Sequence, residues 1–213
     1  MVILFFIAIS PFNEANFVPL PFRSISLLSN PAGIGINPGA ELFLTYHPEL
    51  LQGGISIGNL GFGIARTDTN LIYEIGGGYK LPGAFALGYG RQFGDTTENI
   101  IGVICIPNQY IRLGYKTNLA HKKFIHTGIG INIVGLLTLA CQMNYEGIDD
   151  TKDYLFGFIL NPSYGVKINF ASDQEWNWHI GINLGTSKLN LGLIYSYNTK
   201  KFTGGFIISA QSY

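Results

Sequence analysis

Charged residues are scarce in this chain. Asp, Glu, Lys and Arg make up 12% of its 213 residues, whereas a soluble domain usually carries about 25%. Hydrophobic residues make up 47%, and the mean hydropathy is +0.25. Disordered chains are rich in charge and poor in hydrophobic residues, so this composition excludes disorder. It also argues against an ordinary cytosolic domain.

Long hydrophobic runs are missing as well. The longest run, Met1 to Ile9, is far shorter than the roughly 20 residues that a helix needs to cross a bilayer. This excludes a helical membrane protein. A hydrophobic chain without hydrophobic helices favours a transmembrane β-barrel, which satisfies its backbone hydrogen bonds by closing the sheet.

Neither an excess of one charge nor a cysteine cluster is present. The 13 Lys and Arg balance 13 Asp and Glu, so no basic surface is available and nucleic acid is not an expected partner. Cys105 and Cys141 do not stand in metal-ligand spacing. The alternation described below places both on the outward face of strands that are not neighbours. We therefore expect no disulfide, no metal site and no cofactor.

The first residues resemble a secretory signal sequence. Residues 1–10 match the hydrophobic centre of such a segment in length, although no positive charge precedes them. We expect residues 1–15 to direct export, with cleavage near Ser10 or Ala15. A buried first strand is the alternative.

From about Glu41 onward, large hydrophobic residues alternate with small or polar ones. Residues 71–80, 124–133, 176–184 and 189–197 show the pattern most clearly. One face carries Ile, Leu, Tyr and Trp, and the other carries Gly, Asn, Ser and a few charges. A soluble β-sandwich would carry many Lys and Glu on its polar face. Small polar residues suit a confined interior, and aromatic residues near segment ends suit the girdles of a membrane barrel.

The alternating segments number about fourteen, and 12 to 14 strands fit the sequence. We expect strands at 41–47, 51–58, 60–66, 70–80, 84–92, 98–106, 109–116, 124–133, 136–145, 154–160, 163–170, 176–184, 188–197 and 202–210. Every other connection is tight, including those at 107–108 and 161–162, and the intervening ones are usually longer and polar. Bacterial barrels have short periplasmic turns and longer external loops. The sequence therefore predicts an all-β, antiparallel up-and-down barrel in the bacterial outer membrane, with both termini periplasmic.

Residues 11–40 break the alternation, because four prolines after Pro11 exclude a regular strand or a long helix. Within this stretch, Asn30-Pro31-Ala32-Gly33 resembles the NPA(G) motif near the N-terminus of FadL-like and PorV-like outer-membrane proteins. Those proteins are fourteen-stranded barrels whose N-terminal segment folds into the lumen as a plug or hatch. The resemblance implies that residues 16–40 plug a barrel formed by residues 41–213, with Asn30, Pro31, Ala32 and Gly33 as the plug motif. The chain is about half the usual family length.

The resemblance also implies a function. FadL-like proteins pass hydrophobic molecules, and PorV-like proteins assist type IX secretion. We therefore expect an outer-membrane barrel that passes hydrophobic small molecules through a plugged lumen. A PorV-like secretion or assembly accessory and a general diffusion porin stay open as alternatives. The expected partners are outer-membrane lipid, a hydrophobic small molecule, and secretion or assembly proteins.

The sequence shows no catalytic set, and we predict that the protein is not an enzyme. Residues 54–58 have the GxSxG spacing of a nucleophile elbow, but Ser56 falls inside an alternating strand rather than at a strand-to-helix turn. The four histidines lack metal-ligand spacing. Charges in a confined lumen either line a solute path or pair with each other and with the plug. The residues expected to line the lumen are Glu74, Lys80, Arg112, Lys116, His126, Lys167 and His179.

Overall fold

The computed structural model describes residues 10–12, 16–20, 23–67, 69–119, 124–147 and 151–210. Within these residues, three short helical elements come before the strands: the 3-10 helix η2 (Arg23–Ile25) and the α-helices α1 (Ser26–Ser29) and α2 (Ala32–Ile36). No helix among the described residues is long and hydrophobic enough to span a membrane. Most of the expected export segment, residues 1–9 and 13–15, lies outside the described residues.

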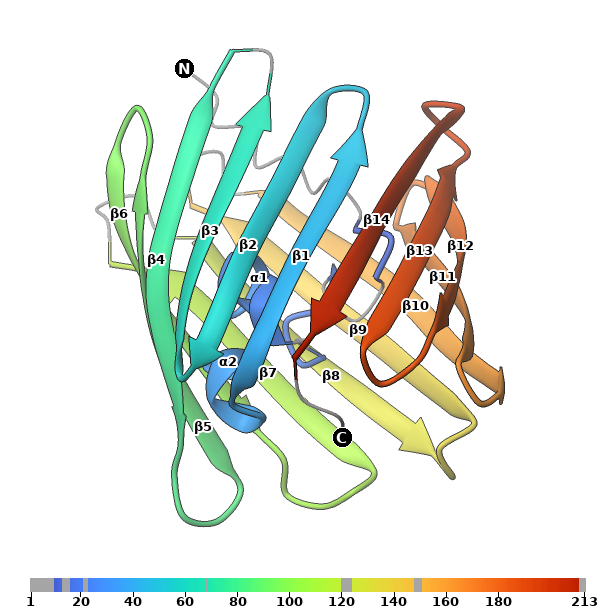
Figure 1. The fold of residues 1–213 in the computed structure, drawn as a ribbon, viewed down its shortest axis with the longest axis horizontal. Helices are drawn as coiled ribbons and strands as arrows, with labels where there is room; N and C mark the ends of the chain where they lie inside the picture. The colour runs from blue at the N-terminus through green and yellow to red at the C-terminus, as the bar shows by residue number, and fades with distance from the viewer. Residues whose placement is uncertain are drawn as a thin grey trace.

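The rest of the described chain forms one closed barrel (Figure 1). Each strand pairs antiparallel with its neighbours in the sequence, and the first strand pairs with the last, so the prediction of a fourteen-stranded antiparallel barrel is confirmed. The strands are β1 (Gly39–His47), β2 (Leu50–Gly58), β3 (Leu60–Thr67), β4 (Leu71–Lys80), β5 (Phe85–Phe93), β6 (Thr97–Cys105), β7 (Ile111–Asn118), β8 (Phe124–Ile133), β9 (Leu137–Glu146), β10 (Thr151–Ser163), β11 (Val166–Asp173), β12 (Trp178–Gly185), β13 (Leu189–Ser196) and β14 (Lys201–Ser209).

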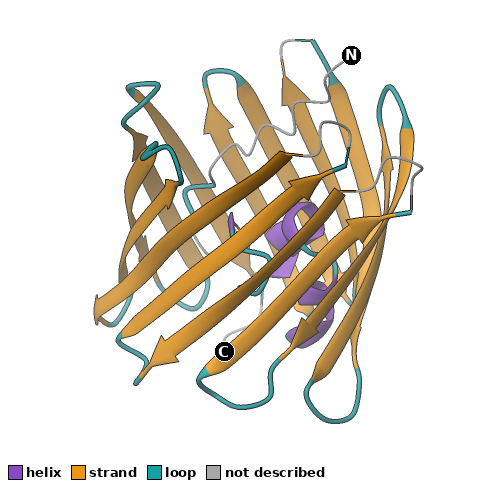
Figure 2. Cartoon of the chain, turned by 180° about the vertical axis from the view of Figure 1, so that it is seen from behind, coloured by secondary structure: helices purple, strands orange, loops and turns teal. Residues whose placement is uncertain are grey.

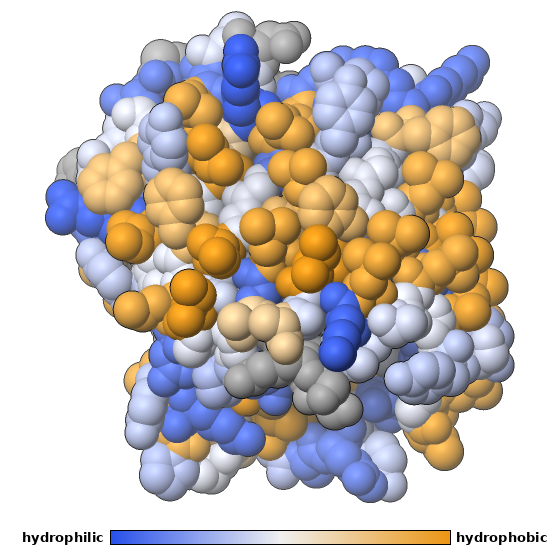
Figure 3. Space-filling view, in the orientation of Figure 1, coloured by the Kyte–Doolittle hydropathy of each residue, from blue (hydrophilic) through white to orange (hydrophobic). Residues whose placement is uncertain are grey.

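Alternation along each strand sets its two faces, because successive side chains point to opposite sides of a sheet. In β1, for example, Leu42 and Leu44 are exposed on the outside, whereas Phe43 between them is buried inside. Large hydrophobic side chains cover much of the outer face (Figure 3). Closure of the sheet leaves no unpaired edge strand.

The longest strand, β10, differs most from the prediction. The sequence predicts a strand at 154–160 and a tight turn at 161–162, but β10 runs on to Ser163 with a register shift after Leu160. The predicted turn is therefore wrong. Proline cannot donate a ladder hydrogen bond, and an irregularity of this kind accommodates Pro162. The chain reverses instead at Gly165, whose φ of 78° suits glycine.

The strand connections form two ends, which we call upper and lower as drawn in Figure 1. The upper end holds the connection from β1 to β2 and every second one after it. The lower end holds the remaining connections, the start of β1 and the end of β14. Connection length does not separate the ends, since the lower β6–β7 connection spans 106–110 and the upper β1–β2 connection only 48–49. The predicted two-residue connection at 107–108 is therefore also wrong.

Candidate functional site: the interior of the barrel

The described residues before β1 lie inside the barrel, with the helices α1 and α2 between the two walls (Figure 2). We call residues 10–12, 16–20 and 23–38 the inner segment. Phe17, Asn30 and Ala32 have no solvent exposure, at 0% each. The helix α2 packs mainly against β4 and β5.

Glycines on the wall let the inner segment approach the strands at backbone distance. A Cβ atom added to Gly88 of β5 would lie 2.1 Å from the main-chain nitrogen of Ala32, and one added to Gly114 of β7 would lie 2.4 Å from that of Pro19. The fit is reciprocal, because a Cβ on Gly35 of the inner segment would lie 2.3 Å from the nitrogen of Tyr79. Backbone against backbone is the arrangement that only glycine permits.

The Asn30 side chain joins the inner segment to two strands. Its Nδ2 donates toward the carbonyl oxygens of Val18 at 3.1 Å, Val103 of β6 at 3.3 Å and Tyr115 of β7 at 3.3 Å. Its Oδ1 accepts a hydrogen bond from the nitrogen of Ala32 at 3.2 Å. The side chain therefore has partners on both of its polar atoms in a fully buried position, where an unpaired amide would be costly.

The other three residues of the predicted plug motif shape the start of α2. Pro31 precedes the helix, where its missing N–H costs nothing. Ala32 and Gly33 form its first turn, and the Gly33 nitrogen donates to the Asn30 carbonyl oxygen at 2.9 Å. The four residues thus form one compact turn against the wall.

On the opposite wall, amide side chains bind the backbone of the inner segment. The carbonyl oxygen of Pro11 accepts hydrogen bonds from Asn183 of β12 at 3.1 Å and from Asn169 of β11 at 3.4 Å. The nitrogen of Val18 donates to the Oε1 of Gln142 on β9. Sequence reasoning missed all three amides. Their inward positions were readable from the alternation, but no sequence signal indicates which backbone group each one binds.

Glu41 ties the inner segment to the junction between the first and last strands, and sequence reasoning missed it as well. Its carboxylate accepts hydrogen bonds from the nitrogen of Ser24 at 3.1 Å and the hydroxyl of Ser24 at 2.8 Å. It also accepts one from the hydroxyl of Ser209 on β14 at 2.8 Å. Three donors satisfy a buried carboxylate on β1 that would otherwise be costly.

A buried pair of charges lies near α1. The Nζ of Lys116 on β7 donates to the carbonyl oxygen of Leu28 at 2.9 Å. Glu74 on β4 and Lys116 are only 2% and 5% exposed, and Glu74 Oε1 has no hydrogen-bond partner among the described residues. Lys116 therefore contacts the inner segment directly.

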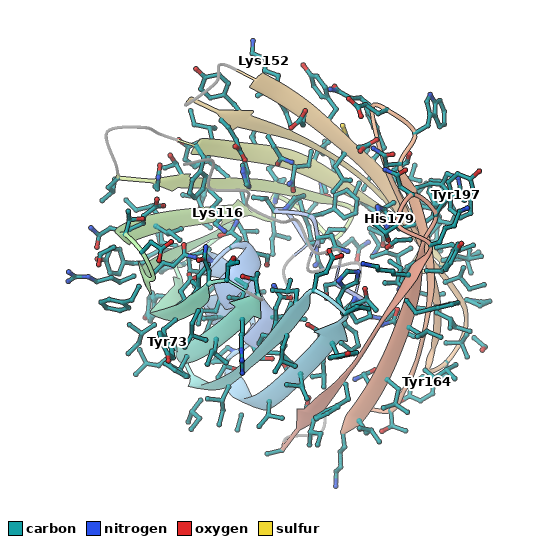
Figure 4. All side chains as sticks on the ribbon, turned by 90° about the horizontal axis from the view of Figure 1, so that it is seen from above. Tyr73, Lys116, Lys152, Tyr164, His179 and Tyr197 are labelled. Atoms are coloured by element: carbon teal, nitrogen blue, oxygen red, sulfur yellow. The ribbon has the colours of Figure 1, made fainter. Side chains whose placement is uncertain are left out.

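The strand register places all seven residues predicted to line the lumen on the inward face, but not in one site. Glu74, Lys116 and His126 lie together on one side, with Lys116 opposite His126 in the register. His179 lies across the barrel, and Figure 4 shows Lys116 and His179 inside the ring of strands. The remaining three, Lys80, Arg112 and Lys167, lie near the lower ends of β4, β7 and β11.

His179 has its own partner, since its Nδ1 lies 2.8 Å from the hydroxyl oxygen of Ser196 on β13. The GxSxG serine, Ser56, is buried within β2. Among the described residues, no group of three or more His, Cys, Asp or Glu is placed to hold a metal ion. The cysteines of β6 and β9 are unpaired.

No protein-family model and no curated protein sequence matches this chain. Solved structures do match. The Pseudomonas putida toluene transporter TodX is similar, with a TM-score of 0.63 and 8% sequence identity. The Ralstonia pickettii toluene transporter TbuX is similar, with a TM-score of 0.60 and 8% sequence identity. Each match covers 93% of this chain and 96% of the transporter chain. The Acinetobacter baumannii outer membrane protein Omp33 is similar, with a TM-score of 0.57 and 9% sequence identity, and the match covers 82% of this chain and 99% of the Omp33 chain. Such low identities show a shared fold alone.

The extent of these matches differs. Residues 39–209, which form the barrel, make up about 80% of the 213 residues. The match to Omp33, at 82%, is close to the barrel alone, whereas the matches to TodX and TbuX, at 93%, also include part of the chain outside it.

Proposed function

We propose that this protein is an outer-membrane barrel that passes hydrophobic small molecules through a lumen closed by its inner segment, which acts as the plug. The observation that carries this proposal is the burial of the inner segment along the inside wall, with hydrogen bonds to β6 and β7 on one side and to β9, β11 and β12 on the other. A segment bound on both sides blocks a water path through the barrel.

The packing around the plug supports a hydrophobic rather than a polar solute. Hydrophobic side chains meet between plug and wall in three clusters. They are Phe12, Ile25, Phe43 and Ile207; Phe17, Leu20, Ala140, Leu155, Ile159 and Ala171; and Ala32, Ala86 and Ile104. A diffusion porin has a polar, water-filled interior instead. Displacement of the plug would uncover the wall members of these clusters, such as Phe43 and Ile159, beside polar side chains such as Asn183. The clusters would offer a hydrophobic solute its contacts.

The outer face supports the membrane location. Large hydrophobic side chains such as Leu60, which is 70% exposed, cover it on nearly every strand. Exposed hydrophobic surface this extensive marks a membrane or protein contact. The fold shared with TodX and TbuX, both described as toluene transporters, agrees with this location and with a hydrophobic solute. We place the lower end, and with it the start of β1 and the end of β14, in the periplasm.

A secretion or assembly accessory is the alternative function. It needs a protein partner, and no observation on the described residues favours one. A diffusion porin is disfavoured by the buried plug.

Single-channel conductance of the refolded full chain in a planar bilayer tests the plug. We expect no steady current from the full chain and a steady current after deletion of residues 11–38. A steady current from the full chain would overturn the plug and favour the porin. Entry of N-phenyl-1-naphthylamine into cells that carry the protein tests the solute, because this hydrophobic dye becomes fluorescent in membranes. No gain in dye entry over cells without the protein would overturn hydrophobic transport.

A further inference from the structure

Charges on the outer face of the strands occur near one end only, and all are cations. The register gives outward positions to Arg66 of β3, Arg91 of β5 and Lys152 of β10. All three are exposed and lie near the upper end. Figure 4, seen from above, shows Lys152 on the outer side of the ring of strands.

The carboxylates on the strands lie on the opposite face from these three cations. Every Asp and Glu within a described strand faces inward: Glu41, Glu74, Glu98, Glu146, Asp153 and Asp173. Lys152 and Asp153 are adjacent in β10 and point to opposite faces. The upper connections, which extend beyond the strands, carry both signs, with Glu49, Asp95 and Glu175 among them. The segregation is therefore a property of the strand surface.

The lower end differs from the upper one in having no outward cation on its described strands. Its strand-borne cations, Lys80, Arg112 and Lys167, all face inward. The outward positions near this end hold hydrophobic side chains such as Tyr79 and Phe85. Near the upper end, Lys116 and Lys201 also face inward. Outward cations on the described strands therefore occur near the upper end alone, and only the upper outer face is basic.

Aromatic residues accompany the three outward cations. The guanidinium of Arg91 lies 5.4 Å from the ring centre of Phe93. Lys152 is opposite Tyr145 in the register, and Arg66 follows Ile64, which is opposite Tyr73. Tyr and Trp prefer the boundary between hydrocarbon and head groups. The cations therefore lie at the level that lipid head groups occupy beside a membrane barrel.

Building on the membrane location proposed above, we propose that Arg66, Arg91 and Lys152 bind the phosphate groups of lipids in the leaflet at the upper end. A phosphate monoester carries about −1.5 to −2 charges at neutral pH, and arginine can bind two of its oxygens at once. Between described residues, no ion pair occupies any of these three cations. The charge asymmetry then orients the barrel, with its upper end in the leaflet richer in phosphate.

Lipid retention tests this site. The full chain is inserted into vesicles of phosphatidylcholine mixed with phosphatidic acid, extracted gently, and the two lipids retained are measured. We expect the wild-type chain to retain phosphatidic acid in preference. Each of the single variants R66Q, R91Q and K152Q should lower the preference for phosphatidic acid about fivefold. The triple variant should lose this preference. The charge-preserving variant R66K/R91K/K152R should keep it, as should K188Q, which removes an exposed cation from a lower connection.

The outcomes are distinguishable. Insertion without a preference for phosphatidic acid, or an unchanged preference in the triple Gln variant, overturns the lipid site and leaves the proposed transport intact. Displacement of the bound lipid by inorganic phosphate at equal concentration overturns lipid as the ligand in favour of free phosphate. Failure of the wild-type chain to insert into either kind of vesicle overturns the membrane location on which both proposals rest.

Discussion

The ammonium group of Lys116 donates a hydrogen bond of 2.9 Å to the main-chain carbonyl oxygen of Leu28, 88 residues earlier in the chain. The donor belongs to the wall and the acceptor lies in α1, within the inner segment. One buried cation therefore does two things: it satisfies a carbonyl group near a helix end and offsets the charge of Glu74.

Replacement of Lys116 should loosen the inner segment and destabilise the fold. In K116M, the Leu28 carbonyl loses its donor and the Glu74 carboxylate loses its nearby cation. We expect a loss of about 3 kcal/mol in unfolding free energy, because one member of a buried charge pair is left alone. Denaturant unfolding followed by tryptophan fluorescence measures it.

The double variant E74Q/K116M should recover part of that loss, since no charge is then left buried. K80M, at an exposed position near the lower end, should leave stability close to wild type. A K116M protein as stable as K80M would contradict a stabilising contact between Lys116 and the inner segment.

Asn30 should matter through its hydrogen bonds rather than its size. N30L keeps the branched shape of the side chain, although leucine is larger, and leaves the carbonyl oxygens of Val103 and Tyr115 without this donor. We expect a loss of about 1–3 kcal/mol in unfolding free energy and current bursts in planar bilayers. N198L, in an exposed upper connection, serves as the control. If N30L and N198L had the same unfolding free energy and neither gave a current, Asn30 would not hold the inner segment in place.

One methyl group on the wall should displace the inner segment. In G88A the new Cβ would lie 2.1 Å from the nitrogen of Ala32, so the backbone must move. We expect a cost of about 1–3 kcal/mol from overpacking and a measurable ion current.

G204A is the matched control, because a Cβ on Gly204 meets nothing closer than 3.9 Å. It should be neutral or slightly stabilising, since alanine lowers the entropy of the unfolded chain. Identical bilayer recordings for the two variants would count against close contact at Gly88.

The upper connection between β1 and β2 should show a pH-dependent contact. The hydrogen bond and charge of Lys201 hold the pKa of Glu49 below its ordinary value. A lowered carboxyl pKa gives stability that is present above the unfolded-state pKa and lost as pH falls through the folded-state pKa. The wild-type chain should therefore exceed E49Q in stability at pH 7 and match it at strongly acidic pH.

Both side chains are more than a third exposed, so this difference should be small and should shrink with added salt. Denaturation midpoints of the two proteins across pH at low and high salt measure it. A difference that persists at acidic pH would show that Glu49 acts through packing instead.

The barrel was predictable because its signal is local. Tyr73 and Glu74 are neighbours in sequence, and their opposite faces follow directly from the period of a strand. The end of β10 was not predictable, because Asn161-Pro162 is typical of a turn, and only its pairing with β9 and β11 shows that the strand continues.

The contacts of the inner segment could not be predicted from the sequence. The resemblance of residues 30–33 to a known motif singled out Asn30, but its acceptors lie 73 and 85 residues away. Gln142, Asn169 and Asn183 look like any inward polar residue in the sequence. Which backbone group each of them binds depends on the path of the inner segment, which contains no periodic pattern.

Glu41 has a consequence for how the molecule is assembled. Its carboxylate takes donors from Ser24 of the inner segment and from Ser209 of the last strand, at the junction where the barrel closes. A barrel that closed around an empty interior would leave this buried carboxylate without the Ser24 donors. The pairing of the first strand with the last is therefore energetically coupled to the placement of the inner segment. In a chain whose inner segment is misplaced, closure of the barrel is less favourable.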